Sequence, residues 1–191
     1  MASPALPPGC TLEVVEDIDA TGLVAPLIAL RWRAWRALDG DLGESPSTLD
    51  LSASDRGALH WLVSRDGQLI AAARLQLIDD PAPPASPYLE QLLRNVRPAG
   101  LVPPGRLAYL SRLVVEPAWQ RRGIGGYLVA HRMQYAAERG AVGGVLTLKR
   151  TPVIEGRARD GWRTVAHMPA EFPRAGVPEQ THILFKALGP A

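Results

Sequence analysis

Hydrophobic residues along this chain follow two spacings, one typical of helices and one typical of strands. Apolar positions recur at helical spacing in 22–38 and in 125–139, which predicts two amphipathic helices. Shorter helices are expected at 87–96 and 152–160, the second ending at Gly161. Alternating or continuous apolar runs predict strands at 11–16, 58–64, 69–78, 107–116, 143–148, 162–167 and 181–188. The interleaved order predicts a mixed α/β fold.

Glycine and proline mark the connections between these elements. Asp66-Gly67 separates two predicted strands and indicates a tight hairpin. Residues 80–87 contain four prolines and cannot continue a strand. Residues 41–56 are expected to form a loop or a short helix, and Gly40 and Gly140 to end the two long helices. With no internal repeat visible, we expect one domain over residues 11–188, preceded by a loosely attached segment, residues 1–10.

Composition narrows the class of protein without identifying it. The chain has 191 residues, enough for one domain with a proper core. No apolar run reaches the roughly 18–20 residues that span a bilayer, and residues 1–8 do not resemble a signal peptide. Cys10 is the only cysteine, which excludes an intrachain disulfide and a cysteine-based zinc site. A net charge of +2 does not favour nucleic-acid binding. We expect a cytoplasmic protein without a membrane partner.

One segment, residues 113–128, has the order strand, turn and helix. Its apolar β-branched run stops at Pro117, and three glycines follow in the turn before the helical pattern begins. Glycines allow a ligand to approach the backbone closely, and the first N–H groups of a helix lack intrahelical partners. Arg121 and Arg122 add positive charge at the same place. The segment therefore predicts a site for a phosphate or pyrophosphate.

The spacing of the glycines narrows the ligand. Leu128 stands where a dinucleotide-binding turn has its third glycine, and no lysine follows as in a Walker loop. The pattern present is Q-x-x-G-x-G, at Gln120, Gly123 and Gly125. It resembles the acyl-coenzyme-A-binding motif of the GCN5-related N-acetyltransferase (GNAT) superfamily. The specific motif covers residues 111–128, and the order of elements matches over roughly residues 11–188.

The resemblance implies a fold, a co-substrate and a binding site. The fold would be a mixed, mostly antiparallel sheet that splays at the acyl-coenzyme-A site and is flanked by helices. The co-substrate would be acetyl-CoA or another acyl-CoA, with no metal. Backbone groups of Leu113 and Val115 would bind the pantetheine arm beside the strand at 143–148. The implied cofactor-binding residues are Leu113, Val114, Val115, Gln120, Arg121, Arg122, Gly123, Ile124, Gly125, Gly126 and Tyr127.

Acyl transfer to an amine needs a held amine, a base and an oxyanion donor. The N–H of Val115 is the nearest candidate for the oxyanion. Candidate bases are Glu116, Tyr109 and Ser111 on one strand, and the acidic residues Asp39, Asp41 and Glu44 after the first helix. His131 falls on an apolar helical stripe and is expected to pack in the core. The remaining histidines show no metal-ligand spacing.

One position departs from the family pattern. Many members carry a tyrosine four residues before a Gly-Phe pair, where it acts as the acid toward the leaving thiolate. Here Gly161-Trp162 occupies the place of that pair, and Arg157 occupies the tyrosine position. Arginine does not donate a proton at neutral pH. Arg157 would instead stabilise the thiolate or pair with a coenzyme phosphate, or it would share a solvated helix face with Arg159.

Three functions stay open at this point. The first is acetyl transfer from acetyl-CoA to a primary amine of a small molecule or peptide. The second is synthesis of a long-chain N-acyl amino acid or acyl-homoserine lactone from acyl-CoA or acyl carrier protein. Residues 30–33 and Ser111-Arg112 look somewhat like segments of acyl-homoserine-lactone synthases. In that case Trp32, Trp35 and Trp61 would line an acyl tunnel instead of packing in the core. The third is a non-catalytic acyl-CoA sensor. We favour the first, and the sequence leaves a homodimer open.

Overall fold

The computed structural model describes residues 5–39, 51, 53–79, 87–97, 102–148, 151–169 and 180–189. The α-helices are α1 (Val24–Asp39), α2 (Ala53–Arg56), α3 (Pro87–Val96), α4 (Ile124–Glu138) and α5 (Thr151–Arg159). The strands are β1 (Cys10–Val15), β2 (Leu59–Arg65), β3 (Gln68–Ile78), β4 (Leu107–Val115), β5 (Gly143–Leu148), β6 (Arg163–Pro169) and β7 (Gln180–Ala187). Short 3-10 turns are η1 (Asp19–Thr21) and η3 (Pro117–Trp119).

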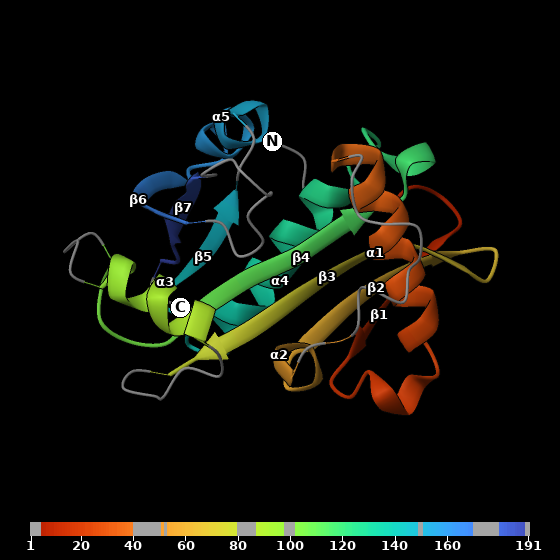
Figure 1. The fold of residues 1–191 in the computed structure, drawn as a ribbon, viewed down its shortest axis with the longest axis horizontal. Helices are drawn as coiled ribbons and strands as arrows, with labels where there is room; N and C mark the ends of the chain where they lie inside the picture. The colour runs from red at the N-terminus through yellow and green to blue at the C-terminus, as the bar shows by residue number, and fades with distance from the viewer. Residues whose placement is uncertain are drawn as a thin grey trace. The chain divides into compact units, whose positions relative to one another are not determined.

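The strands form a seven-stranded sheet in the order β1-β2-β3-β4-β5-β7-β6 (Figure 1). The mixed α/β prediction is thereby confirmed. The structure divides into two compact units, residues 1–76 with 111–132, and residues 77–110 with 133–191. Residues of β3, β4 and α4 are divided between the two units.

In the first unit, β1, β2 and β3 are neighbouring antiparallel strands, and η1, α1 and α2 connect β1 to β2. β1 pairs with β2 from Cys10↔Arg65 to Val15↔His60. β2 and β3 are joined by the expected hairpin, in which Asp66 has φ 50° and Gly67 has φ 76°. Two successive left-handed residues match the right-handed twist of the flanking strands, which explains the Asp-Gly pair at this position.

Helix α1 covers these three strands with its apolar face. Leu27, Leu30 and Ala34 are fully buried, as the helical spacing predicts. They pack with Leu62 and Ala72 from the strands, together with residues at the ends of β1 and β4. The start of α1 is fixed locally, because the hydroxyl of Thr21 accepts a hydrogen bond from the N–H of Leu23 at 3.1 Å. Burial of one stripe of α1 leaves its other face for charged residues.

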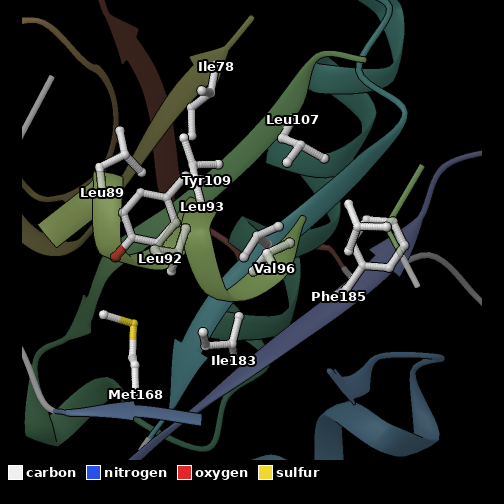
Figure 2. Packing of buried hydrophobic residues seen from close by; sticks show 12 residues of the cluster. Ile78, Leu89, Leu92, Leu93, Val96, Leu107, Tyr109, Met168, Ile183 and Phe185 are labelled. Atoms are coloured by element: carbon white, nitrogen blue, oxygen red, sulfur yellow. The ribbon is translucent and has the colours of Figure 1, made fainter. Parts of the chain in front are cut away.

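In the second unit, β4 and β5 form a parallel ladder from Leu107↔Gly143 to Leu110↔Leu146. β7 pairs antiparallel with both β5 and β6. Helix α3 packs Leu89, Leu92, Leu93 and Val96 against the apolar side chains of these strands (Figure 2).

The predicted ends of two helices are also observed. Gly140 after α4 has φ 74°, and Gly161 after α5 has φ 84°, so both glycines adopt the left-handed conformation of a helix C-terminus. α2 lies within the segment expected as a loop or a short helix. Gly40, residues 41–50 and residues 80–86 lie outside the described residues. In the described part of the chain, no helix has the length and apolarity needed to cross a membrane.

Candidate functional site

The turn between β4 and α4 is built from local backbone hydrogen bonds and two left-handed residues. The N–H of Trp119 bonds the carbonyl of Glu116 at 2.8 Å, which closes η3. Arg121 then has φ 60° and Gly123 has φ 83°. The N–H of Tyr127 bonds the carbonyl of Gly123 at 2.9 Å and continues α4. The N–H groups of the first turn precede this bond and have no intrahelical acceptor.

The space in front of these amides is open. An added Cβ on Gly123 or Gly126 would meet no described atom within 4 Å. On Gly125 it would meet only Cδ2 of Leu113, at 3.7 Å. Packing within the described residues therefore does not require glycine at these positions, although the left-handed backbone of Gly123 favours it. An open helix N-terminus of this kind can accept an anion.

Polar side chains of the turn hold it in place and leave positive charge at its surface. Nε2 of Gln120 donates to the carbonyl of Val115 at 3.1 Å, which ties the turn to the end of β4. Arg121 and Arg122 are both exposed. The guanidinium of Arg122 lies 4.8 Å from the ring centre of Trp119. The charge predicted from sequence is thus present beside the open amides.

The end of β4 alternates between core and partly open positions. Val114 is buried in the core of the first unit, whereas Leu113 and Val115 are half-buried. Arg112, just before them, has φ 53°, an uncommon backbone conformation for a non-glycine residue in a strand. Its guanidinium lies 5.5 Å from the ring centre of Trp35 in α1. Because the side chain of Val114 is buried, only its backbone can contact a ligand.

A buried network of arginines around one carboxylate fixes Ser111. Asp55 pairs with Arg31 at 2.8 Å and with Arg74 at 3.2 Å. Nε of Arg74 also donates to the hydroxyl oxygen of Ser111 at 2.8 Å. Arg132 donates to the carbonyls of Arg74, at 2.7 Å, and Ser111, at 3.3 Å. Ser111 is thus held by Arg74 and Arg132, two charged residues that no sequence motif indicates.

Desolvation governs the titration of this network. Burial lowers the pKa of Arg31, and the charge and hydrogen bond of Asp55 oppose that effect. Burial also lowers the pKa of His60, whose Nε2 lies 2.8 Å from the carbonyl oxygen of Asp55. His60 is therefore held neutral at pH 7, because the charged form is disfavoured in the dry interior.

Glu116 occupies a different environment at the end of β4. Nε and Nη2 of Arg33 both donate to its Oε2, at 2.9 and 2.8 Å. Its backbone N–H bonds the carbonyl of Ile70 at 2.8 Å. Both side chains reach solvent, Arg33 to 45% and Glu116 to 23%. Ser111 and Glu116 lie in the same unit, each fixed by an arginine. Asp41 and Glu44 lie outside the described residues, as does the side chain of Asp39.

Tyr109, the third candidate on β4, lies in the core of the second unit. Its side chain is 2% exposed and packs in the apolar cluster. Figure 2 shows its ring beside Leu89 and Leu93 of α3. These contacts place the tyrosine among packed apolar residues.

Arg157, the residue at the departure from the family pattern, is also partly enclosed. Its side chain is 13% exposed, and its Nη1 pairs with Oδ2 of Asp160 at 3.3 Å. Burial lowers the pKa of Arg157, while the charge of Asp160 opposes that effect. The side chain of Arg159 is exposed and lies on a solvated face of α5, whereas the side chain of Arg157 does not.

His131, Trp32 and Trp61 of the first unit pack against neighbouring side chains. Nε1 of the fully buried Trp61 donates to Nδ1 of His131 at 3.0 Å, so this half-buried histidine contacts the core through Trp61. Trp32 lies under the guanidinium of Arg36 at 4.7 Å. Within the described residues, no group of three or more His, Cys, Asp or Glu side chains is arranged to hold a metal ion.

Several solved structures of acetyltransferases have a fold similar to that of this chain. The fold is similar to the ribosomal-protein-S18-alanine N-acetyltransferase of Escherichia coli, with TM-score 0.65, 19% identity, and 95% of this chain and 96% of that chain covered. It is also similar to Arabidopsis thaliana NAA60 in complex with acetyl-CoA, with TM-score 0.60, 16% identity, and 94% and 98% covered.

A third similar structure is the PaiA N-acetyltransferase of Thermoplasma acidophilum in complex with coenzyme A, with TM-score 0.57, 15% identity, and 93% and 99% covered. No curated protein sequence matches this chain. The profile of the Acetyltransferase (GNAT) family matches residues 24–153, which include the turn and the strands on either side of it. The chain belongs to the GNAT acetyltransferase family, and it is an acyl-transferring enzyme of that type.

Proposed function

We propose that this enzyme transfers an acetyl group from acetyl-CoA to a primary amine of a small molecule or peptide. The observation that carries the proposal is the turn before α4, where three glycines leave the first helical amides open. Two structures with a similar fold are complexes with coenzyme A and acetyl-CoA, which supports the choice of donor.

In this proposal the donor is bound mainly by backbone groups. The pyrophosphate lies on the N–H groups of residues 121–126, and the charges of Arg121 and Arg122 stabilise it. The pantetheine arm follows the backbone of residues 113–115. Gln120 keeps the turn attached to Val115 and has a positioning role. Ile124 and Tyr127 contribute as residues of the first helical turn.

The reaction itself demands little of the side chains. The amine nitrogen attacks the thioester carbonyl, the C–S bond breaks, and a proton leaves the ammonium for a base. We propose Glu116, whose Oε1 accepts no hydrogen bond from the described residues, or Ser111 as that base. Arg157 stabilises the thiolate or a phosphate, and the backbone N–H of Val115 serves the oxyanion. Tyr109 is the weakest of the three candidate bases in and after β4, because it is enclosed by apolar side chains.

Acetyl transfer is favoured over the long-chain alternative by the packing of one tryptophan. Trp61 is fully buried and bonded to His131, so it fills the core and does not line an acyl tunnel. An acyl chain without a tunnel gains no burial energy from added methylenes.

The proposal is tested by calorimetry with acetyl-CoA. Gly125→Asp adds a side chain and a negative charge at the open amides, so we expect binding to be lost. Gly189→Asp is the matched control, because a Cβ there also meets no described atom within 4 Å and the charge change is the same. Equal affinities of the two variants and the wild type would reject the donor site.

A further inference from the structure

A groove of about 590 Å³ opens in the first unit, beside the segment that follows β4. It is lined by α1, by the turn and first residues of β3, and by Glu116 and Trp119. It contains one ion pair, Arg33–Glu116. The proposed donor site uses the backbone of residues 121–126, so this groove is not explained by that site.

The ion pair uses only part of its hydrogen-bonding capacity. A guanidinium has five N–H groups, and the two that Arg33 donates both end on Oε2 of Glu116. Three N–H groups of Arg33 and the other carboxylate oxygen, Oε1, have no partner among the described residues. Both side chains reach solvent. The groove therefore presents unused cationic donors and an unused anionic acceptor side by side.

The positive charge of Arg33 and the negative charge of Glu116 together determine which ligand charges the groove favours. A ligand with only a carboxylate would gain from Arg33 but would be repelled by Glu116, and a ligand with only an amine would meet the reverse. A molecule that carries both groups on neighbouring atoms satisfies both partners. An α-amino acid has that pattern, with its carboxylate on Arg33 and its ammonium on Oε1 of Glu116.

The walls beside the ion pair are apolar and one of them is held in place. Ala29 of α1 and Leu69 and Ile70 of β3 line the groove. The ring of Trp119 has the guanidinium groups of Arg65 and Arg122 each 4.8 Å from its centre, which fixes the indole. Such walls suit an apolar side chain.

We propose that this groove binds an α-amino acid with an apolar side chain. The proposal rests on the contacts of the groove and holds independently of the donor site. The ligand is distinct from acyl-coenzyme A, and its ammonium contacts Glu116, one of the two bases proposed above for the reaction.

Three related probes separate the two charged contacts. L-leucine has both groups, leucinamide lacks the carboxylate, and 4-methylpentanoate lacks the amine. In calorimetry with the full chain, we expect leucine to bind at least about tenfold more tightly than either analogue. Arg33→Ala should remove the preference for leucine over leucinamide. Glu116→Gln should instead remove the preference for leucine over 4-methylpentanoate.

Controls keep the result specific to the groove. Arg36→Ala removes a neighbouring guanidinium of α1 that stacks on Trp32, and it should leave all three affinities unchanged. Urea unfolding of each variant verifies that it is folded. The proposal is overturned if leucine, valine and phenylalanine all fail to bind the wild type at about 10 mM, or if Arg33→Ala leaves the preference for leucine over leucinamide intact.

Discussion

The turn before α4 and the network around Asp55 belong to the same unit but are built in opposite ways. The turn is made by consecutive residues, and its glycines leave the backbone amides open. The network joins Arg31, Asp55, Arg74 and Ser111, which are far apart in sequence, through buried side chains. A local backbone site is thus specified by a short motif, whereas a side-chain network depends on the whole fold.

The largest expected effect comes from removing the carboxylate of the network. Asp55→Asn leaves Arg31 and Arg74 buried without their anionic partner, which costs about 3–5 kcal/mol of unfolding free energy. Urea unfolding measures this cost. Asp19→Asn is the control, because its pair with Arg56 is exposed and contributes at most about 1 kcal/mol. Similar losses in the two variants would contradict the buried role of Asp55.

A second prediction separates two arginines of α5. Arg157→Ala should lower kcat/KM for acetyl-CoA by about tenfold, which corresponds to about 1.4 kcal/mol, because the half-buried guanidinium would no longer stabilise the thiolate or a phosphate. Arg159→Ala, on the same helix but exposed, should stay within about 0.5 kcal/mol of the wild type. Wild-type kinetics in the Arg157 variant would exclude a role in the reaction.

The network also predicts a pH dependence of stability. The pKa of His60 is lowered by burial, so the unfolded chain binds this proton more readily than the native protein. Stability from this group is complete above the unfolded pKa of about 6.5 and decreases as the pH falls below it. The slope is at most about 1.4 kcal/mol per pH unit. His60→Gln should flatten the denaturation profile between about pH 6.5 and 5. An unchanged slope in the His60 variant would count against its burial as a neutral group.

The smallest expected effect concerns the acyl chain. Specificity constants for acetyl-, hexanoyl- and decanoyl-CoA with one accepted amine should not rise with length, because Trp61 fills the core. A tunnel would instead add about 0.8 kcal/mol for each buried methylene. A steady rise would replace acetyl transfer with the long-chain alternative.

The fold was largely predictable because its signals are local. Periodicity located the strands and long helices, and Asp66-Gly67 and Gly140 marked a hairpin and a helix end. The turn was predictable for the same reason. The network was not predictable, although Arg74 inside the apolar strand predicted at 69–78 was a usable signal. The ion pair of Arg33 and Glu116 was also missed, because 83 positions separate its members and only tertiary packing brings them together.

The most direct test of the donor site is the response of the backbone amides to acetyl-CoA. In a 15N-labelled sample, we expect the largest chemical-shift changes at residues 121–126, because the proposed pyrophosphate site consists of their N–H groups. The amides of the Asp66-Gly67 hairpin, which belong to the same unit, should be little affected. If acetyl-CoA binds and the amides of residues 121–126 do not respond, or if it does not bind at all, the proposed donor site is wrong.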